Sequence, residues 1–99
     1  KPLRNTLYLS GSWTVTDEYA RSETAGSIIY KYSAKNVYLV MSAEKGMSVT
    51  IKIDGKIVRT LDVKEHTLYT IVQGTDYSEH LLEIVVPEAG LEAYAFTFG

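Results

Sequence analysis

The sequence contains no cysteine among its 99 residues. This absence excludes disulfides, thiolate chemistry and sulfur-ligated metals from the chain, but it does not fix the compartment, because a domain with an adequate core needs no disulfide. Lys and Arg number 10 against 12 Asp and Glu, so no excess of one charge attracts phosphate backbones or anionic lipids. No apolar run approaches the roughly 20 residues that span a bilayer. We therefore expect neither nucleic-acid binding nor membrane insertion by this chain.

The residues that are present suit a single folded domain over residues 1–99. Hydrophobic residues make up 45% and charged residues 22% of the chain, which allows a buried core beneath a hydrated surface. The chain opens at Lys1 rather than at a methionine and shows no signal peptide, so we expect a mature or excised fragment of a longer protein.

Strand-forming residues dominate the pattern. Eight tyrosines and repeated period-two alternation favour strands over helices, because branched and aromatic side chains suit a pleated, half-buried surface. The predicted strands are Leu7–Ser10, Trp13–Tyr19, Ser27–Ser33, Asn36–Ala43, Met47–Ile53, Lys56–Val63, Thr67–Val72, His80–Val86 and Leu91–Phe98. Turns are expected between them, including Lys35-Asn36 and Gly74-Thr75-Asp76, and Asp17–Ala25 is expected to be a loop. About eight or nine short antiparallel strands predict an all-β sandwich, jelly roll or small barrel.

The Asp54-Gly55 pair between two of these runs predicts a β-hairpin. With a two-residue loop of Asp54 and Gly55, odd-numbered apolar residues of one strand would lie opposite even-numbered residues of the other. A three-residue loop of 53–55, with Gly55 in a left-handed bulge, pairs Ile51 with Ile57 instead. We favour this loop, because a slip of one residue turns every side chain to the other face of the sheet.

Several segments follow one another in the order of a known family. They are Leu9–Trp13, Ala34 with Val37–Val40, Asp54-Gly55, Leu68-Tyr69, His80 with Leu82–Ile84, and Ala93–Gly99. Together they resemble the C-terminal domain attached to DipZ-like and TlpA-like bacterial thioredoxin proteins, and the terminal Tyr-Ala-Phe-Thr-Phe-Gly is the most specific part. The resemblance implies a β jelly roll similar to carbohydrate-binding modules, which follows an extracytoplasmic thioredoxin domain in the periplasm or cell envelope. The Cys-x-x-Cys of that family belongs to the upstream domain, so the redox chemistry is assigned to no residue here.

The titratable residues do not form a recognisable catalytic or metal motif. His66 and His80 lack partners at metal-ligand spacing, and His80 is expected to be a hydrogen-bonded structural histidine near a strand start. Serine, histidine and aspartate are all present, but no Gly-x-Ser-x-Gly elbow accompanies them. We expect the carboxylates, Glu92 among them, to be solvated charges at turns or outward positions. We expect no catalytic residue, no metal ligand and no cofactor. A structural Ca²⁺ would need oxygen ligands converging from separate loops, which sequence cannot show.

Aromatic residues are the more informative candidates, because sugar rings stack their apolar faces on Trp or Tyr. Trp13 and Tyr94 alternate in phase with apolar neighbours, so we expect them in the core. The ligand-binding candidates are Tyr38, Tyr69, Tyr19, Arg21 and Tyr77. The first two lie out of phase with their apolar neighbours, and they suit equally a cross-strand pair or an inter-domain contact. Apolar residues also fall on the face opposite the core, namely Val40, Ile71, Leu81 and Val85.

Two functions from different classes follow. The first is a non-catalytic accessory domain that binds glycan and localises or orients its thioredoxin partner. The alternative is a structural domain that docks on the adjacent thioredoxin domain or forms a homodimer, with no sugar ligand. An independent enzyme is disfavoured, because no nucleophile, acid-base pair or cofactor loop has the sequence context that its chemistry requires.

Overall fold

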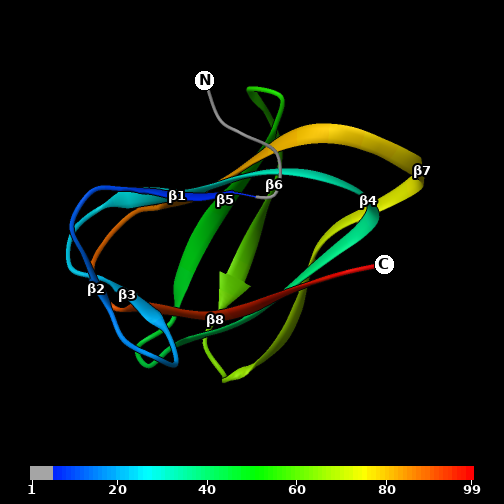
Figure 1. Ribbon diagram of the computed structural model, residues 1–99. Coiled ribbons are helices and arrows are strands. Elements are labelled where there is room, and N and C mark those ends of the chain that lie inside the picture. The colour runs from blue at the N-terminus through cyan, green and yellow to red at the C-terminus, as the bar shows by residue number, and fades with distance from the viewer. Residues whose placement is uncertain (1–5) are drawn as a thin grey trace.

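The computed structural model describes residues 6–99, which form eight strands and no helix (Figure 1). The strands are β1 (Leu7–Ser10), β2 (Trp13–Val15), β3 (Ala20–Ser22), β4 (Gly26–Ala43), β5 (Met47–Ile53), β6 (Lys56–Val63), β7 (Thr67–Val86) and β8 (Leu91–Phe98). Every pairing is antiparallel, as the sequence predicts. Within the described residues, no helix has the length and hydrophobicity needed to cross a bilayer.

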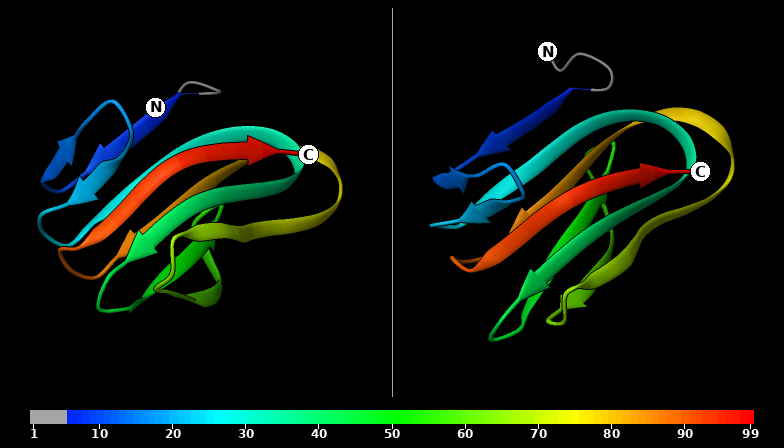
Figure 2. Two further views of the ribbon diagram at one scale, coloured as in Figure 1. Left: turned by 90° about the horizontal axis from the view of Figure 1, so that it is seen from below. Right: turned by 60° about the horizontal axis from the view of Figure 1, so that its bottom comes forward.

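Two long strands, β4 and β7, pair along most of their length and curve together, which folds the sheet into a sandwich (Figure 2). Different strands pair with the two halves of this β4–β7 ribbon, so the sheet forms two layers. The first layer has the order β1, the first half of β4, the second half of β7, β5 and β6. The second layer has the order β2, β3, β8, the second half of β4 and the first half of β7.

The turns predicted at Lys35-Asn36 and at Gly74-Thr75-Asp76 are wrong, because both strands continue through these positions. Gln73 pairs with Asn36 and Ser78 pairs with Ala34, so 74–77 lie opposite Lys35 alone and form a bulge. A Cβ on Gly74 would stand 2.7 Å from the Lys35 carbonyl oxygen. The polar residues and glycine thus mark a bend with a register shift, not a reversal of the chain.

The segment from Trp13 to Ala25 also differs from the prediction. The strand beginning at Trp13 ends at Val15, and Ala20–Ser22 forms a strand where a loop is expected. Ser22 explains the difference, because its buried hydroxyl donates to the Glu88 carbonyl at 2.9 Å and accepts from the Leu91 amide at 3.0 Å. These bonds anchor β3 to the turn before β8, and neither is visible as local periodicity.

The hairpin between β5 and β6 has a two-residue loop, so the predicted three-residue loop is wrong. Asp54 and Gly55 both have positive φ, at 53° and 85°, as a type I′ turn requires. The pairing of Ile51 with Ile57 is also wrong, since Ile51 pairs with Arg59 and Val58 is the bulged residue. The bulge lies at Val58 of β6 and not at Gly55, where the prediction places it. From Ile51 back to Met47, odd-numbered residues of β5 pair with odd-numbered residues of β6.

Alternating inward residues of both layers form one core. The fully buried side chains include Ile28, Tyr32, Val37, Leu39, Met41, Val49, Ile51, Val63, Ile71, Leu82, Ile84 and Leu91. Trp13 and Phe96 pack partly buried against this core. Ile71, expected on the outer face, is buried because it is the extra residue at a bulge between β4 and β7.

A bulge in β8 likewise changes the position of Tyr94. Met41 pairs with Ala93 and Leu39 pairs with Phe96, so β8 carries one extra residue between these pairs. Tyr94 is half-buried and does not belong to the hydrophobic core, contrary to the expectation from its phase with Phe96. It lies on the outside of the second layer, where it contributes to the candidate site.

Candidate functional site

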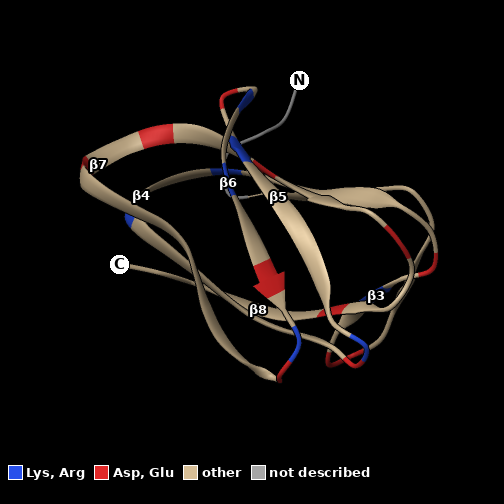
Figure 3. Cartoon of the chain, turned by 180° about the vertical axis from the view of Figure 1, so that it is seen from behind, with Lys and Arg blue, Asp and Glu red and all other residues tan. Residues whose placement is uncertain are grey.

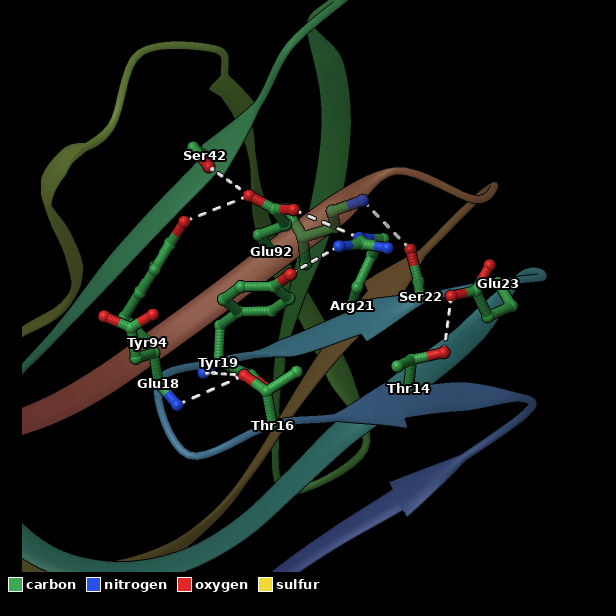
Figure 4. Close-up of polar contacts among 11 residues, drawn as sticks. Thr14, Thr16, Glu18, Tyr19, Arg21, Ser22, Glu23, Ser42, Glu92 and Tyr94 are labelled. Carbon is green, nitrogen blue, oxygen red and sulfur yellow. Dashed lines mark hydrogen bonds and ion pairs between the residues drawn. The ribbon is translucent and has the colours of Figure 1, made fainter.

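The ends of β3, β8 and β4 hold a cluster of polar and aromatic side chains (Figure 4). Glu92 of β8 pairs with Arg21 of β3 on one side and with Ser42 of β4 on the other. Arg21 Nε donates to Glu92 Oε2 at 3.1 Å, while Tyr94 and Ser42 donate to Oε1 at 3.0 and 3.3 Å. Arg21 Nη2 also donates to the Tyr19 hydroxyl. We call these five residues the Arg21 cluster.

Three rings meet at this cluster. Tyr19 and Tyr94 make an edge-to-face contact with ring centroids 5.5 Å apart. His66 stacks on Tyr94 at 4.2 Å, and the Arg21 guanidinium lies 5.1 Å from the centre of the Tyr19 ring. The rings and the charged groups fix one another, so the site presents ordered aromatic surface beside ordered hydrogen-bonding groups.

Protonation states in the cluster are well defined. Desolvation would raise the pKa of the Glu92 carboxyl, but hydrogen bonds from Arg21 and Tyr94, with the Arg21 charge, hold that pKa below its ordinary value. Desolvation raises the pKa of the Tyr94 phenol. The hydrogen bond with Glu92 raises the pKa of Arg21. At neutral pH the cluster therefore contains a carboxylate, a guanidinium and a neutral phenol.

A groove of about 590 Å³ adjoins the cluster and shares three of its residues. Its lining comprises Arg21–Glu23, Ser42–Met47, Lys64, Glu88–Gly90 and Glu92. The loops after β4 and β7 thus form its walls. This volume lies within the range of small-molecule sites.

The outer face of the first layer has a different character. Lys52 lies 3.9 Å from Glu83, Lys31 lies 3.8 Å from Glu79, and the Ser27 hydroxyl donates to Glu83 at 2.8 Å. Acidic and basic residues are interspersed along these strands, as Figure 3 shows from behind. The Arg21 cluster differs from this face, because it combines aromatic rings with charged and polar groups.

The structure brings together two of the five predicted ligand-binding residues, Tyr19 and Arg21. Tyr38 lies on β4 opposite Thr70 and Thr97.

The remaining two candidates have other positions. Tyr69 packs partly buried against the core, and its hydroxyl donates to the Glu65 carbonyl at 2.7 Å and accepts from the Lys64 amide, so it anchors the β6–β7 loop. Tyr77 is 72% exposed on the bulge of β7.

Sequence reasoning missed Ser42, Glu92, Tyr94 and His66 as members of the site. Ser42 had a usable signal, because it stands between the inward-facing Met41 and Ala43. The sequence places Glu92 on the solvated surface, because its partners Arg21 and Ser42 come from other strands. It places Tyr94 in the core, because the bulge of β8 leaves no mark in the alternation. Among residues 6–99, no group of three or more His, Cys, Asp or Glu side chains is placed to hold a metal ion.

Fold and site together define a cysteine-free jelly-roll β-sandwich domain with a polar and aromatic site at one end. The chain belongs to the thioredoxin-like C-terminal domain family, whose model matches residues 1–99. No curated protein sequence matches it.

Solved structures of the same fold include parts of carbohydrate-active enzymes. A family two carbohydrate esterase from Clostridium thermocellum, in complex with cellohexaose, aligns with a TM-score of 0.82 and 12% identity over 95% of this chain and 31% of its own. The family two carbohydrate esterase from Cellvibrio japonicus gives 0.79 and 14%, over 95% and 30%. The salicylyl-acyltransferase SsfX3 from a tetracycline biosynthetic pathway gives 0.76 and 12%, over 94% and 36%. The chain spans about a third of each of these proteins, and the likeness shows the fold alone.

Proposed function

We propose that this domain is an accessory module of an extracytoplasmic thioredoxin-like thiol-disulfide protein and that it binds glycan at the Arg21 cluster. The family supports an accessory role, because its members are C-terminal domains of thioredoxin-like proteins. The chain contains no cysteine, so any thiol-disulfide exchange by the parent protein uses residues outside this domain. The domain's contribution is then to position the parent protein, and it takes no part in the redox step.

The observation that carries glycan binding is the contact of Tyr19 and Tyr94 with the Arg21–Glu92 ion pair. The ion pair lines the polar groove, and the two rings line a second, more apolar groove. A pyranose ring offers apolar C–H faces to an aromatic side chain and hydroxyls to a carboxylate and a guanidinium. The two kinds of surface meet here within one site. We expect millimolar to micromolar affinity, because removing water from sugar hydroxyls offsets much of the gain.

Isothermal titration of the domain with cellohexaose and with chitohexaose tests this proposal. Tyr19→Ala should abolish measurable heat, because it removes a ring of the cluster and the partner of Arg21 Nη2. Tyr77→Ala is the matched control, since Tyr77 is 72% exposed on the bulge of β7. Equal binding by both variants, or no binding by the wild-type domain at millimolar sugar, contradicts glycan recognition at this cluster.

A second candidate function, docking of the parent's thioredoxin-like domain, is favoured by an apolar groove between β1 and the β2–β3 turn. Its lining includes Leu7, Leu9, Val15 and Phe96, together with Tyr19 and Tyr94 of the Arg21 cluster. Leu7 and Val15 are 46% and 68% exposed. This groove adjoins the first strand, and family membership supports a thioredoxin-like domain as the partner, because the family consists of C-terminal domains of thioredoxin-like proteins. Replacing Leu7 and Val15 with serine should then separate the two domains in the parent protein, measured as faster inter-domain proteolysis. Unchanged proteolysis contradicts docking, and dimerisation of the isolated domain would assign the groove to a second copy.

A further inference from the structure

Three side chains near the bend of β7 form a hydrogen-bonded chain separate from the Arg21 cluster. Oγ of Ser78 lies 2.8 Å from Nε2 of His80, and Nδ1 of the same ring lies 2.6 Å from Oδ2 of Asp54. Ser78 and His80 are two residues apart on one strand and so project from the same face, while Asp54 comes from the β5–β6 turn. The order of contacts, hydroxyl to imidazole to carboxylate, is that of a nucleophile, its base and the group that orients the base.

The carboxylate of this chain is held in place by the backbone. Asp54 Oδ1 accepts the amide of Leu81 at 2.9 Å, and the Asp54 amide donates to the Leu81 carbonyl at 2.9 Å. The Leu81 amide, followed by the His80 side chain, lowers the pKa of Asp54. An ionised carboxylate can only accept, so Nδ1 carries a proton, and in the neutral ring Nε2 then has the lone pair that accepts from the Ser78 hydroxyl.

Asp76 is the other group that faces the hydroxyl. Its Oδ1 lies 3.3 Å from Ser78 Oγ, against 2.8 Å for His80 Nε2, and a hydroxyl has one proton to donate. The shorter contact favours donation to the imidazole. Water and small molecules reach the site, because 35% of the His80 side chain is exposed and Ser78 is itself partly exposed.

We propose that Ser78 is a nucleophile activated by His80 and Asp54, and that it takes acyl groups from activated esters. Ser78 Oγ forms a bond to the acyl carbon and its proton passes to His80 Nε2. The bond to the leaving alkoxide or phenolate then breaks, and Nε2 gives the proton to that oxygen or to water. Water then attacks the acyl-serine and gives a proton to the free Nε2. The bond from the acyl carbon to Ser78 Oγ breaks, and Nε2 returns its proton to Oγ, which releases the carboxylic acid and restores the hydroxyl. Activated esters are the substrate class, because a good leaving group relies least on further stabilisation of the oxyanion. This reactivity is separate from glycan binding at the Arg21 cluster, and either can fail alone.

Treating the domain with p-nitrophenyl acetate, followed by mass spectrometry of its peptides, tests the proposal. We expect the acetyl group on Ser78 and a burst of about one p-nitrophenolate per molecule. Ser48 provides an internal control, since it is an exposed serine that donates to the Asp62 carboxylate with no histidine beside it. Acetylation of Ser78 no faster than that of Ser48 overturns the proposal even if no variant folds.

Two variants separate the roles of the neighbouring carboxylates. Asp54→Asn keeps a residue type that tolerates the left-handed turn, and it should slow acetylation of Ser78 by about 10²-fold, because the imidazole loses its orientation. Asp76→Asn should leave the rate unchanged or increase it. A loss with Asp76→Asn equal to that with Asp54→Asn would mean that Ser78 donates to Asp76, which also overturns the proposal.

Discussion

Arg21 and Glu92 lie opposite each other in the register between β3 and β8, and their side chains form an ion pair at 3.1 Å. Ser42, on the other side of Glu92, extends this pair into a polar row across three strands. Because backbone pairing sets the row, the side chains need no flexible loop to bring them together. The candidate site is therefore organised before any ligand arrives.

Ser22→Ala should destabilise the domain by about 1–3 kcal/mol, because the Ser22 hydroxyl is fully buried and its loss leaves the Leu91 amide and the Glu88 carbonyl without this partner. Urea unfolding followed by circular dichroism measures the change. Ser48→Ala is the control and should be close to neutral, since Ser48 is exposed. Equal effects of the two substitutions would show that Ser22 does not anchor β3.

Gly26→Ala should detach β1 from β4. A Cβ at Gly26 would stand 2.1 Å from the Ser10 carbonyl oxygen, and backbone on both sides leaves no flexible group to move away. Faster hydrogen exchange of the β1 amides is the expected result. Gly55→Ala provides the comparison, because nothing lies within 4 Å of that position and only the left-handed backbone opposes the methyl group, at about 1–2 kcal/mol. Unchanged hydrogen-exchange protection of the β1 amides in Gly26→Ala would contradict the close approach of the Gly26 and Ser10 backbones.

The sequence predicts where strands occur far better than where their phase changes. Period-two alternation correctly predicts β1, β5, β6 and β8, because each packs one face on the core. Extra residues at Val58, Ile71 and within β8 shift the phase, and each bulge results from pairing with a distant strand. No local pattern records such a pairing.

The same limit applies to the candidate site. Tyr19 and Arg21 were predicted together because they are neighbours in the sequence. Glu92 and Tyr94 were not, since they meet Arg21 only through the pairing of β3 with β8. The Ser78–His80–Asp54 chain likewise needs a strand and a turn that are distant in sequence. Individual residues with charged or reactive side chains can be recognised in the sequence. Which of them lie close together depends on the fold.

Acid should weaken the hydrogen bonds from Asp54 that link the β5–β6 turn to β7. The Leu81 amide and His80 hold the pKa of Asp54 below its ordinary value of 3.8, so this carboxylate stabilises the folded state above that value. The contribution is lost as the pH falls through the lower, folded-state pKa. The free energy of unfolding of Asp54→Asn should therefore fall less steeply below about pH 4 than that of the wild type. Identical slopes in urea titrations at pH 2 to 5 would contradict this role of Asp54.

The most direct test of glycan recognition is a map of backbone amide chemical shifts in the isotopically labelled domain, recorded while cellohexaose or chitohexaose is added to millimolar concentration. Recognition at the Arg21 cluster predicts saturable shifts centred on Arg21, Glu92 and Tyr94. An unchanged spectrum, or shifts at Leu7 and Val15 with none at Arg21 and Glu92, would contradict it.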